Sequence, residues 1–175
     1  MFKTIRSLLG RRENSGASTR SKDPGNEMFI LRGGKSVRAD AVFIARSSGD
    51  LQAMLAARSI RTNPVDRHFL LMGIVDQTYK ERKIPERRAL CIETCEQHLR
   101  EFAKIAPALK KEMDGVLPRV TTFQKYATIL GEDGEYGRAI KVCKRAIAFG
   151  LHDGTKGNYA GRIERLTKKM KKGPR

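Results

Sequence analysis

The sequence predicts an all-α protein, built as a stack of antiparallel helix pairs and closed by a C-terminal capping helix. Apolar residues recur at helical spacing in successive segments between residues 36 and 172. Proline or glycine stands at most breaks between these segments, where one helix ends and the next begins. The 175 residues suit a single domain with its own core, and no run approaches the roughly 20 apolar residues of a membrane-spanning helix. We therefore expect one helical domain, residues 36–172, after a separate N-terminal segment.

Residues 1–30 are expected to be a basic and largely disordered segment. The stretch GRRENSGASTRSKDPGNE, residues 10–27, has almost no large apolar side chains and cannot bury enough surface to offset the entropy lost on ordering. Before it, Phe2, Ile5 and Leu8 share one side of a short helical element. That element could touch an anionic membrane, but its length favours a frayed or self-docked terminus because stable anchoring takes two signals. We expect no secretion signal, since no small-residue cleavage site follows.

Two short helices are expected between residues 36 and 62. The preceding stretch LRGGKSV ends like a nucleotide-binding P-loop, but Phe29 occupies the position of that loop's first glycine, so we reject a P-loop. Gly49 and Asp50 mark the turn between the two helices. The stretch AVFIA, residues 41–45, fits a strand as an alternative. The buried sides of the two helices would carry Val37, Ala41, Ile44 and Ala45, and then Leu51, Met54 and Leu55.

A longer helix pair is expected over residues 65–104. Pro64 and Pro85 each stand where proline fits the first turn of a helix, since its missing N–H would have no intrahelical partner there. The stretch KIPE, residues 83–86, provides the break between the two helices. Their apolar stripes contain Leu70, Leu71, Ile74, Val75 and Tyr79, and then Ala89, Ile92, Cys95, Leu99 and Phe102.

The clearest helix pair is expected over residues 119–150. The stretches RVTTFQKYATIL and EYGRAIKVCKRAIAFG are amphipathic, and GEDG between them supplies glycines for a chain reversal. Small residues at Ala127 and Ala139 would let the two helices approach closely. Phe123, Leu130 and Ile147 would then fill the space around them.

This pair resembles one unit of the tetratricopeptide repeat, over about residues 120–153. The residues that stand at the spacing of the repeat framework are Phe123, Tyr126, Ala127, Leu130, Gly134, Tyr136, Ala139, Cys143 and Ala146. The departures are phenylalanine for tryptophan at 123, leucine for tyrosine at 130, cysteine for an aromatic residue at 143, and leucine for the closing proline at 151. The other two pairs look like degenerate copies, and the chain is similar to a group of poorly characterised bacterial repeat proteins. The resemblance implies a right-handed, solenoid-like stack of helix pairs that binds other proteins.

A capping helix is expected over residues 158–172. Repeat stacks need a terminal helix that buries one side on the last pair and offers a polar outer side. Ile163, Leu166 and Met170 share one face of this helix. The basic residues that would point elsewhere are Arg162, Arg165, Lys168, Lys169 and Lys172.

The glycine-rich stretch HDGTKG, residues 152–157, is expected to be the joint before that helix. Gly154 and Gly157 would adopt backbone angles that other residues avoid, Asp153 or Thr155 would cap backbone N–H groups, and Tyr159 would pack beneath. The alternative is a phosphate site at the helix start that uses Lys156 and Arg162. An enzyme that uses Asp153 and Lys156 near a phosphate is a remote third hypothesis. We prefer the structural interpretation, since a stack of helix pairs requires such a joint.

Cysteines and histidines provide the candidates for metal binding and further candidates for catalysis. Cys91, Cys95 and His98 share one helical side, and Cys143 could supply a fourth zinc ligand. We predict core packing instead, because these positions coincide with buried stripes and cysteine is among the most buried residue types. His68, His98 and His152 are isolated in the sequence, and no nucleophile with a local base is evident. We therefore expect no catalytic residue, no metal, no cofactor and no enzymatic activity.

Charge is the strongest anomaly of the composition. The chain has 36 Lys and Arg residues against 19 Asp and Glu, a net charge of +17 and a pI near 10.3. Such a surface favours an acidic partner. An odd number of cysteines argues against a disulfide framework and favours the cytoplasm.

Two functions remain after these exclusions. The first is a protein-interaction module with a groove formed by the first helix of each pair, in which Gln124 and Thr128 face a protein or peptide partner. The second is salt-sensitive, sequence-nonspecific RNA or DNA binding through two basic stripes. Those stripes are Arg138, Lys141 and Arg145, and Arg162, Arg165 and Lys169. We favour the first, because 6% aromatic residues and no tryptophan leave little for base stacking.

Overall fold

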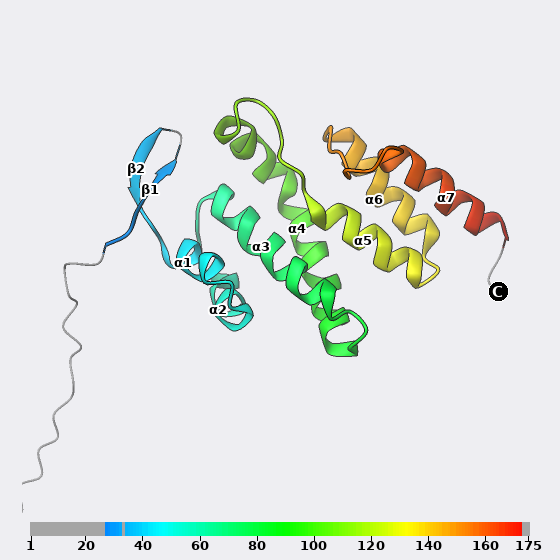
Figure 1. Ribbon diagram of the computed structural model, residues 1–175, viewed down its shortest axis with the longest axis horizontal. Helices are drawn as coiled ribbons and strands as arrows, with labels where there is room; N and C mark the ends of the chain where they lie inside the picture. The colour runs from blue at the N-terminus through cyan, green and yellow to red at the C-terminus, as the bar shows by residue number, and fades with distance from the viewer. Residues whose placement is uncertain (1–26, 33, 173–175) are drawn as a thin grey trace, which may run out of the picture.

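The computed structural model describes residues 27–32 and 34–172. This part of the chain is mostly helical, in agreement with the predicted class, and its helices follow one another along the long axis of the molecule (Figure 1). None of these helices has both the length and the apolar composition needed to cross a bilayer. The predictions for residues 1–26, including the element with Phe2, Ile5 and Leu8, lie outside the described residues.

A β-hairpin precedes the helices, which the sequence analysis did not expect. Strands β1 (Phe29–Arg32) and β2 (Lys35–Arg38) are antiparallel, with Ile30 opposite Val37. Gly34 in the turn has a φ of 75°, which glycine adopts without a steric penalty. The assignment of residues 29–30 to a disordered segment and of residues 36–38 to a helix is therefore wrong. Local strand pairing across a glycine turn outweighs the helical spacing of Val37.

The next two helices are short and capped by aspartates. Helix α1 (Ala41–Ser48) is capped by Asp40, whose Oδ1 accepts a hydrogen bond of 2.7 Å from the backbone N–H of Phe43. Helix α2 (Leu51–Ala56) follows and continues into a 3-10 turn, η1 (Ala57–Ser59). Residues 41–45 are thus helical and not a strand. Because α1 begins at residue 41, its buried face carries Val42 and Ala45, and Ile44 is exposed, contrary to prediction.

Helices α3 (Pro64–Lys80) and α4 (Pro85–Glu112) pack against each other along their lengths. Each begins with proline in its first turn, and Asn63 Oδ1 accepts the Asp66 backbone N–H at 2.9 Å. The expected end at residue 104 is wrong, because α4 continues through Pro107 to Glu112. Ile105 and Leu109 are buried on either side of that proline, so tertiary burial compensates for the lost helical hydrogen bond.

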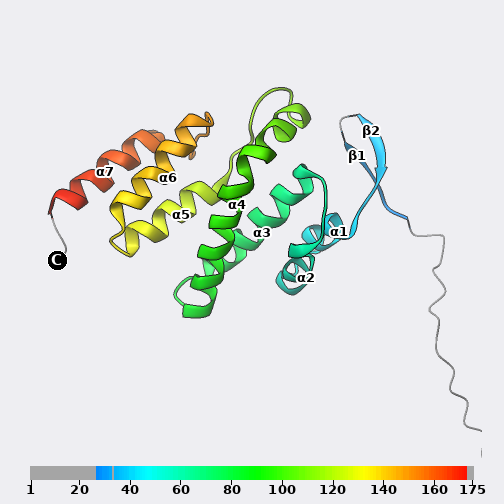
Figure 2. The same cartoon turned by 180° about the vertical axis from the view of Figure 1, so that it is seen from behind.

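Helices α5 (Thr121–Glu132) and α6 (Tyr136–Ala148) form the next antiparallel pair (Figure 2). The reversal uses Gly134 at a φ of 75°. Ile147 is exposed rather than buried. The half-buried Phe149 packs edge-on against Phe102 instead, with ring centroids 4.9 Å apart. The buried framework residues of this pair are Phe123, Tyr126, Ala127, Leu130, Ala139, Cys143 and Ala146, while Tyr136 packs against the core partly buried.

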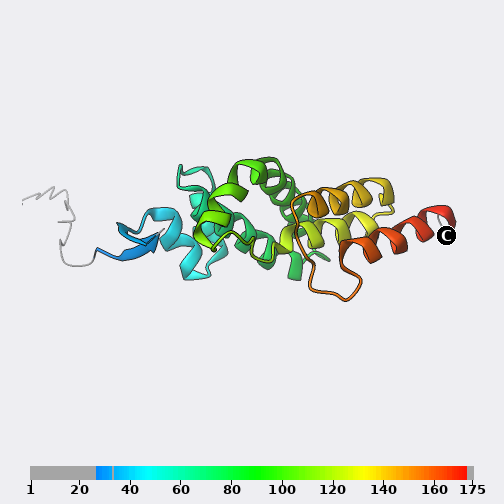
Figure 3. The same cartoon turned by 90° about the horizontal axis from the view of Figure 1, so that it is seen from above.

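Helix α7 (Asn158–Lys172) lies against α6, after a loop that bulges from the helices (Figure 3). Tyr159 is fully buried beneath this loop, and Gly154 has a φ of 81°. Gly157 does not share the positive φ expected for it; Asn158 adopts one instead. Met170 is exposed, so the apolar face of the helix ends one turn earlier, at Leu166.

Two clusters of buried side chains form the core, and α3 contributes to both. The smaller cluster joins α1, α2 and α3 through Val42, Met54 and Ile74. The larger cluster extends from α3 to α7. The helical domain is therefore continuous from α1 to α7.

Candidate functional site

A groove of about 200 Å³ lies between α5 and α7. Thr128, expected to face a partner, and Arg162, expected to be a phosphate ligand, meet here: Arg162 Nη1 donates to Thr128 Oγ1 at 3.1 Å. Gln124 lies one turn before Thr128, and its backbone carbonyl accepts the Thr128 hydroxyl at 2.9 Å. The residues that line the groove are Ala127, Thr128, Gly131, Glu132, Arg162, Arg165, Leu166 and Lys169.

Small residues of α5 bring the two helices together at the base of this groove. A Cβ atom on Gly131 would lie 3.1 Å from Leu166 Cδ2, closer than ordinary van der Waals contact. Ala127, one turn earlier, is also buried. The sequence analysis missed Gly131, although a glycine inside a helical pattern signals a close approach.

Arg162 is fixed in place by the loop that precedes its helix. Besides Thr128, it contacts Asp153, with Nη2 3.3 Å from Oδ2. Burial raises the pKa of Asp153, but hydrogen bonds from Thr155 and the charge of Arg162 outweigh this effect and hold the pKa below its ordinary value. Asp153 is thus a buried carboxylate that orients Arg162 toward α5. The prediction that Arg162 points away from the fold is wrong.

Two further cations of α7 line the groove without a carboxylate partner. Arg165 and Lys169 are exposed and take part in none of the ion pairs that the structure shows among its described residues. Glu132 on the opposite wall does not balance them, because its oxygens lie 3.1 Å from both Arg82 and Arg88. Burial raises the Glu132 pKa, but hydrogen bonds from both arginines lower it overall. The groove therefore has a net positive charge.

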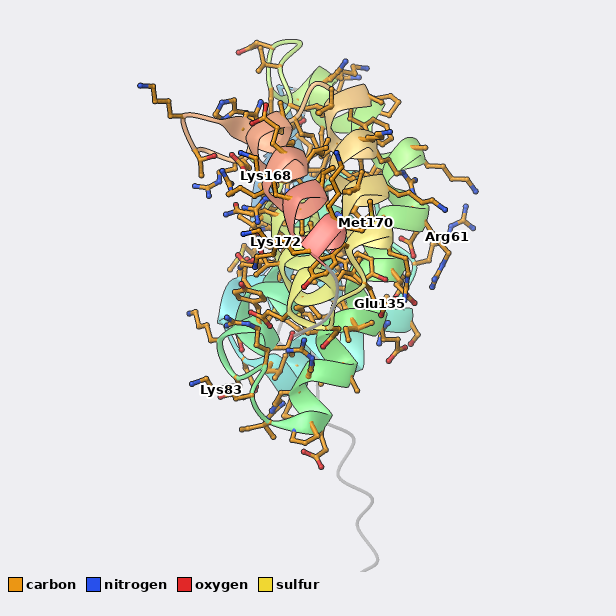
Figure 4. The ribbon with its side chains drawn as sticks, turned by 90° about the vertical axis from the view of Figure 1, so that its right-hand side faces the viewer. Arg61, Lys83, Glu135, Lys168, Met170 and Lys172 are labelled. Carbon is orange, nitrogen blue, oxygen red and sulfur yellow. The ribbon has the colours of Figure 1, made fainter. Side chains whose placement is uncertain are left out.

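The basic character of α7 extends around its outer surface. Figure 4 shows the helix end-on, with Lys168 and Lys172 toward one side and Met170 toward the other. All three side chains are exposed. An anionic ligand that entered the groove would therefore also meet the field of these lysines.

The basic residues predicted on α6 do not join this groove. Arg138 binds Glu135, Glu96 and the hydroxyl of Tyr126. Arg145 donates to a backbone carbonyl of α4, at Leu99, over 2.5 Å. Lys141 is exposed on α6, and Lys156 is exposed in the loop before α7. This stripe therefore serves largely to attach α6 to α4.

A larger hollow of about 470 Å³ lies between η1, α3 and α4. Two of its arginines are held in ion pairs, while Arg61 and Lys104 at its edge are exposed. Arg58 contacts Glu93 at 3.0 Å, and Arg67 binds both oxygens of Glu101, at 2.8 and 2.9 Å. Such bidentate pairs hold their geometry well. We therefore rank this hollow below the groove between α5 and α7.

The core contains a chain of polar side chains that sequence reasoning did not identify. His68 Nδ1 and His98 Nε2 are 3.0 Å apart, and His98 Nδ1 lies 2.8 Å from Thr122 Oγ1. All three residues are fully buried. Burial, with the charge of Arg46, lowers the pKa of His68 to about 4, and burial lowers the pKa of His98 well below its ordinary value. Both rings are therefore neutral at pH 7 and act as packing groups.

The three cysteines are also buried core residues. Cys91 and Cys95 lie on the inner face of α4, and Cys143 lies on α6. The described residues contain no group of three or more His, Cys, Asp or Glu side chains arranged to hold a metal ion. The nitrogens of His98 face His68 and Thr122.

Comparison of the chain with protein-family models, with curated proteins and with solved structures gave no significant match.

Proposed function

We propose that this protein is a non-enzymatic, tetratricopeptide-like interaction module that binds an acidic segment of another protein in the groove between α5 and α7. The successive antiparallel helix pairs and the repeat-like spacing of residues 120–153 support the module. The charge of the groove supports the acidic ligand.

The observation that carries the proposal is the pair of unengaged cations, Arg165 and Lys169. Each lies in a groove whose only carboxylate, Glu132, is already neutralised by two arginines. Arg162 is held at the base of the groove, so a carboxylate of the ligand would meet a preorganised guanidinium. The buried Ala127 and Leu166 form the apolar floor of the groove.

Nucleic acid is the less favoured ligand for this groove. No aromatic side chain is among the residues that line it, so bases would have no stacking surface. In the second basic stripe, on α6, Arg138 and Arg145 already contact neighbouring side chains and backbone. In that stripe a phosphate backbone would therefore find Lys141 alone outside such contacts.

A direct test measures the fluorescence anisotropy of a labelled peptide that alternates Glu, Asp and Leu, titrated with the full chain. We expect saturable binding that weakens as salt rises. The double variant R165E/K169E should weaken it about 30-fold or more, because two attractive charges become repulsive.

The matched control is K141E/K144E, which makes the same charge change on the exposed face of α6. This control should lower affinity about threefold at most, through the net charge alone. Equal losses in both variants would contradict a groove-specific site. Tighter binding of a labelled single-stranded oligonucleotide than of the peptide, with loss in R165E/K169E, would assign the groove to nucleic acid and refute the proposal.

A further inference from the structure

The β1–β2 hairpin lies at the end of the molecule opposite α7 (Figure 1). It presents large apolar side chains to solvent. Leu31 is 69% exposed, Phe29 59% and Met28 55%. These exposures are high for neighbouring large apolar residues and indicate a surface that meets a partner.

The register of the hairpin gathers two of these side chains on one face. Phe29 is opposite Arg38 and Leu31 is opposite Ser36, so these four residues share the outer face. Ile30 and Arg32, which alternate with them, are half-buried toward the helices. The outer face thus combines two large apolar groups with a cation.

Two ion pairs attach the inner face to the helical domain. Arg32 Nη2 lies 2.5 Å from Asp66 of α3, and Arg32 Nη1 lies 3.9 Å from Glu112 at the end of α4. The outer face is therefore presented on an anchored element. The end of α4, which the inner face contacts, also carries the exposed Lys110 and Lys111.

We propose that the hairpin docks the protein on an anionic lipid surface, with Phe29 and Leu31 inserted at the headgroup level. Arg38, beside the apolar residues on the outer face, would contact anionic headgroups. Arg38 also contacts Glu27, but both side chains are largely exposed, so a lipid phosphate can compete for the guanidinium. This docking is independent of the acidic-peptide groove at the other end of the molecule.

Charge favours a lipid surface over two other partners of the hairpin, a second copy of the chain and an added β-strand. A second copy of the chain would bring two surfaces of the same sign together, since the net charge is +17. An added strand would pair with only four residues, and cations beside a strand edge discourage such pairing. An anionic bilayer would bury the apolar side chains and pair its headgroups with the basic ones.

The test is co-sedimentation of the full chain with phosphatidylcholine vesicles, without and with about 30% phosphatidylglycerol. We expect binding to the anionic vesicles only. The variant F29S/L31S should lower the partition coefficient of the protein onto these vesicles about tenfold. The matched control I147S/M170S removes two exposed apolar residues from α6 and α7 and should bind like the parent.

Three outcomes would overturn the proposal. The first is equal binding of F29S/L31S and the parent, which would place membrane contact elsewhere in the chain. The second is absence of binding to anionic vesicles. The third is a solution dimer, measured by light scattering, that F29S/L31S converts to a monomer while vesicle binding persists.

Discussion

The two ends of the helical domain use arginine in opposite ways. Near α1 and α3, Arg32 and Arg46 both bind Asp66, which is only 1% exposed. Near α7, Arg162 has its carboxylate but Arg165 and Lys169 have no ion-pair partner within the described part of the chain. A high net charge therefore does not locate a binding surface by itself. The proposed groove rests instead on which of its cations are paired inside the fold and which are not.

The largest effect is expected from Asp66→Ala at the paired end. Burial raises the Asp66 pKa, but hydrogen bonds from Asn63, Arg32 and Arg46 lower it overall. Its removal would leave the Arg46 guanidinium without a counter-charge and Arg32 with only the more distant Glu112, at a cost of about 3 kcal/mol in the free energy of unfolding. Urea denaturation followed by circular dichroism measures this loss. Asp133→Ala, which breaks a more exposed pair with Arg88, should cost less than about 1 kcal/mol, and equal losses would contradict the comparison.

The core between the two ends contains the buried, neutral side chains of His68 and His98. Their burial predicts that the stability of the fold depends on pH. Because burial in the folded protein lowers the pKa of His68 to about 4 and lowers the pKa of His98 well below its ordinary value, the unfolded chain binds more protons below about pH 6.5. The free energy of unfolding should therefore fall as the pH drops from 6.5 toward 4, by roughly 1.4 kcal/mol per pH unit for each histidine.

Denaturation at several pH values checks this dependence with two variants. His68→Gln removes one of the two titrating rings and should lower the slope in that range. His152→Gln changes an exposed ring and serves as the control. A parent protein with no loss of stability between pH 6.5 and 5 would contradict the neutral, buried pair.

A smaller effect is expected from the loop that orients Arg162. Gly154 has a φ of 81°, and an added Cβ would lie 3.0 Å from Arg119 Cζ. Gly154→Ala should thus destabilise the protein by about 1 to 2 kcal/mol. Gly137→Ala, in α6 with nothing near the added methyl group, should stabilise it by about 0.5 kcal/mol. Thermal denaturation of both variants tests whether the loop, rather than glycine replacement in general, is sensitive.

The smallest effect on stability is expected from R165E/K169E. Both side chains are exposed and make no ion pair in the described residues, so the free energy of unfolding should change by about 0.5 kcal/mol or less. The same variant is expected to lose peptide binding. A destabilisation comparable to that of Asp66→Ala would show that these cations are structural.

The sequence predicted the long helices well, because their boundaries carry strong local signals. Pro64 and Pro85 stand at the first turns of α3 and α4, and Asn158 to Lys172 form α7 with the bounds expected. The hairpin was missed because four-residue strands give little periodicity.

Other features depend on tertiary contacts that no local pattern records. Pro107 predicts a helix break, yet burial of Ile105 and Leu109 keeps α4 intact across it. The groove could not be predicted, because it depends on the direction of the Arg162 side chain. This side chain points to the carboxylate of Asp153, nine residues earlier, rather than toward solvent. Helical periodicity assigns a residue to a face but does not specify its partner.

The two-sided burial of α3 determines how the molecule loses its structure. Leu70 and Ile74 of this helix belong to the smaller core cluster, and Val65 and Val75 to the larger one. Unfolding of α1 and α2 would therefore expose buried apolar residues of α3 to water. Detachment of α3 would expose both clusters. Amide protons in α1 and in α4 should then exchange with deuterium at the same slow rate, through one concerted opening of the molecule rather than by peeling from its end.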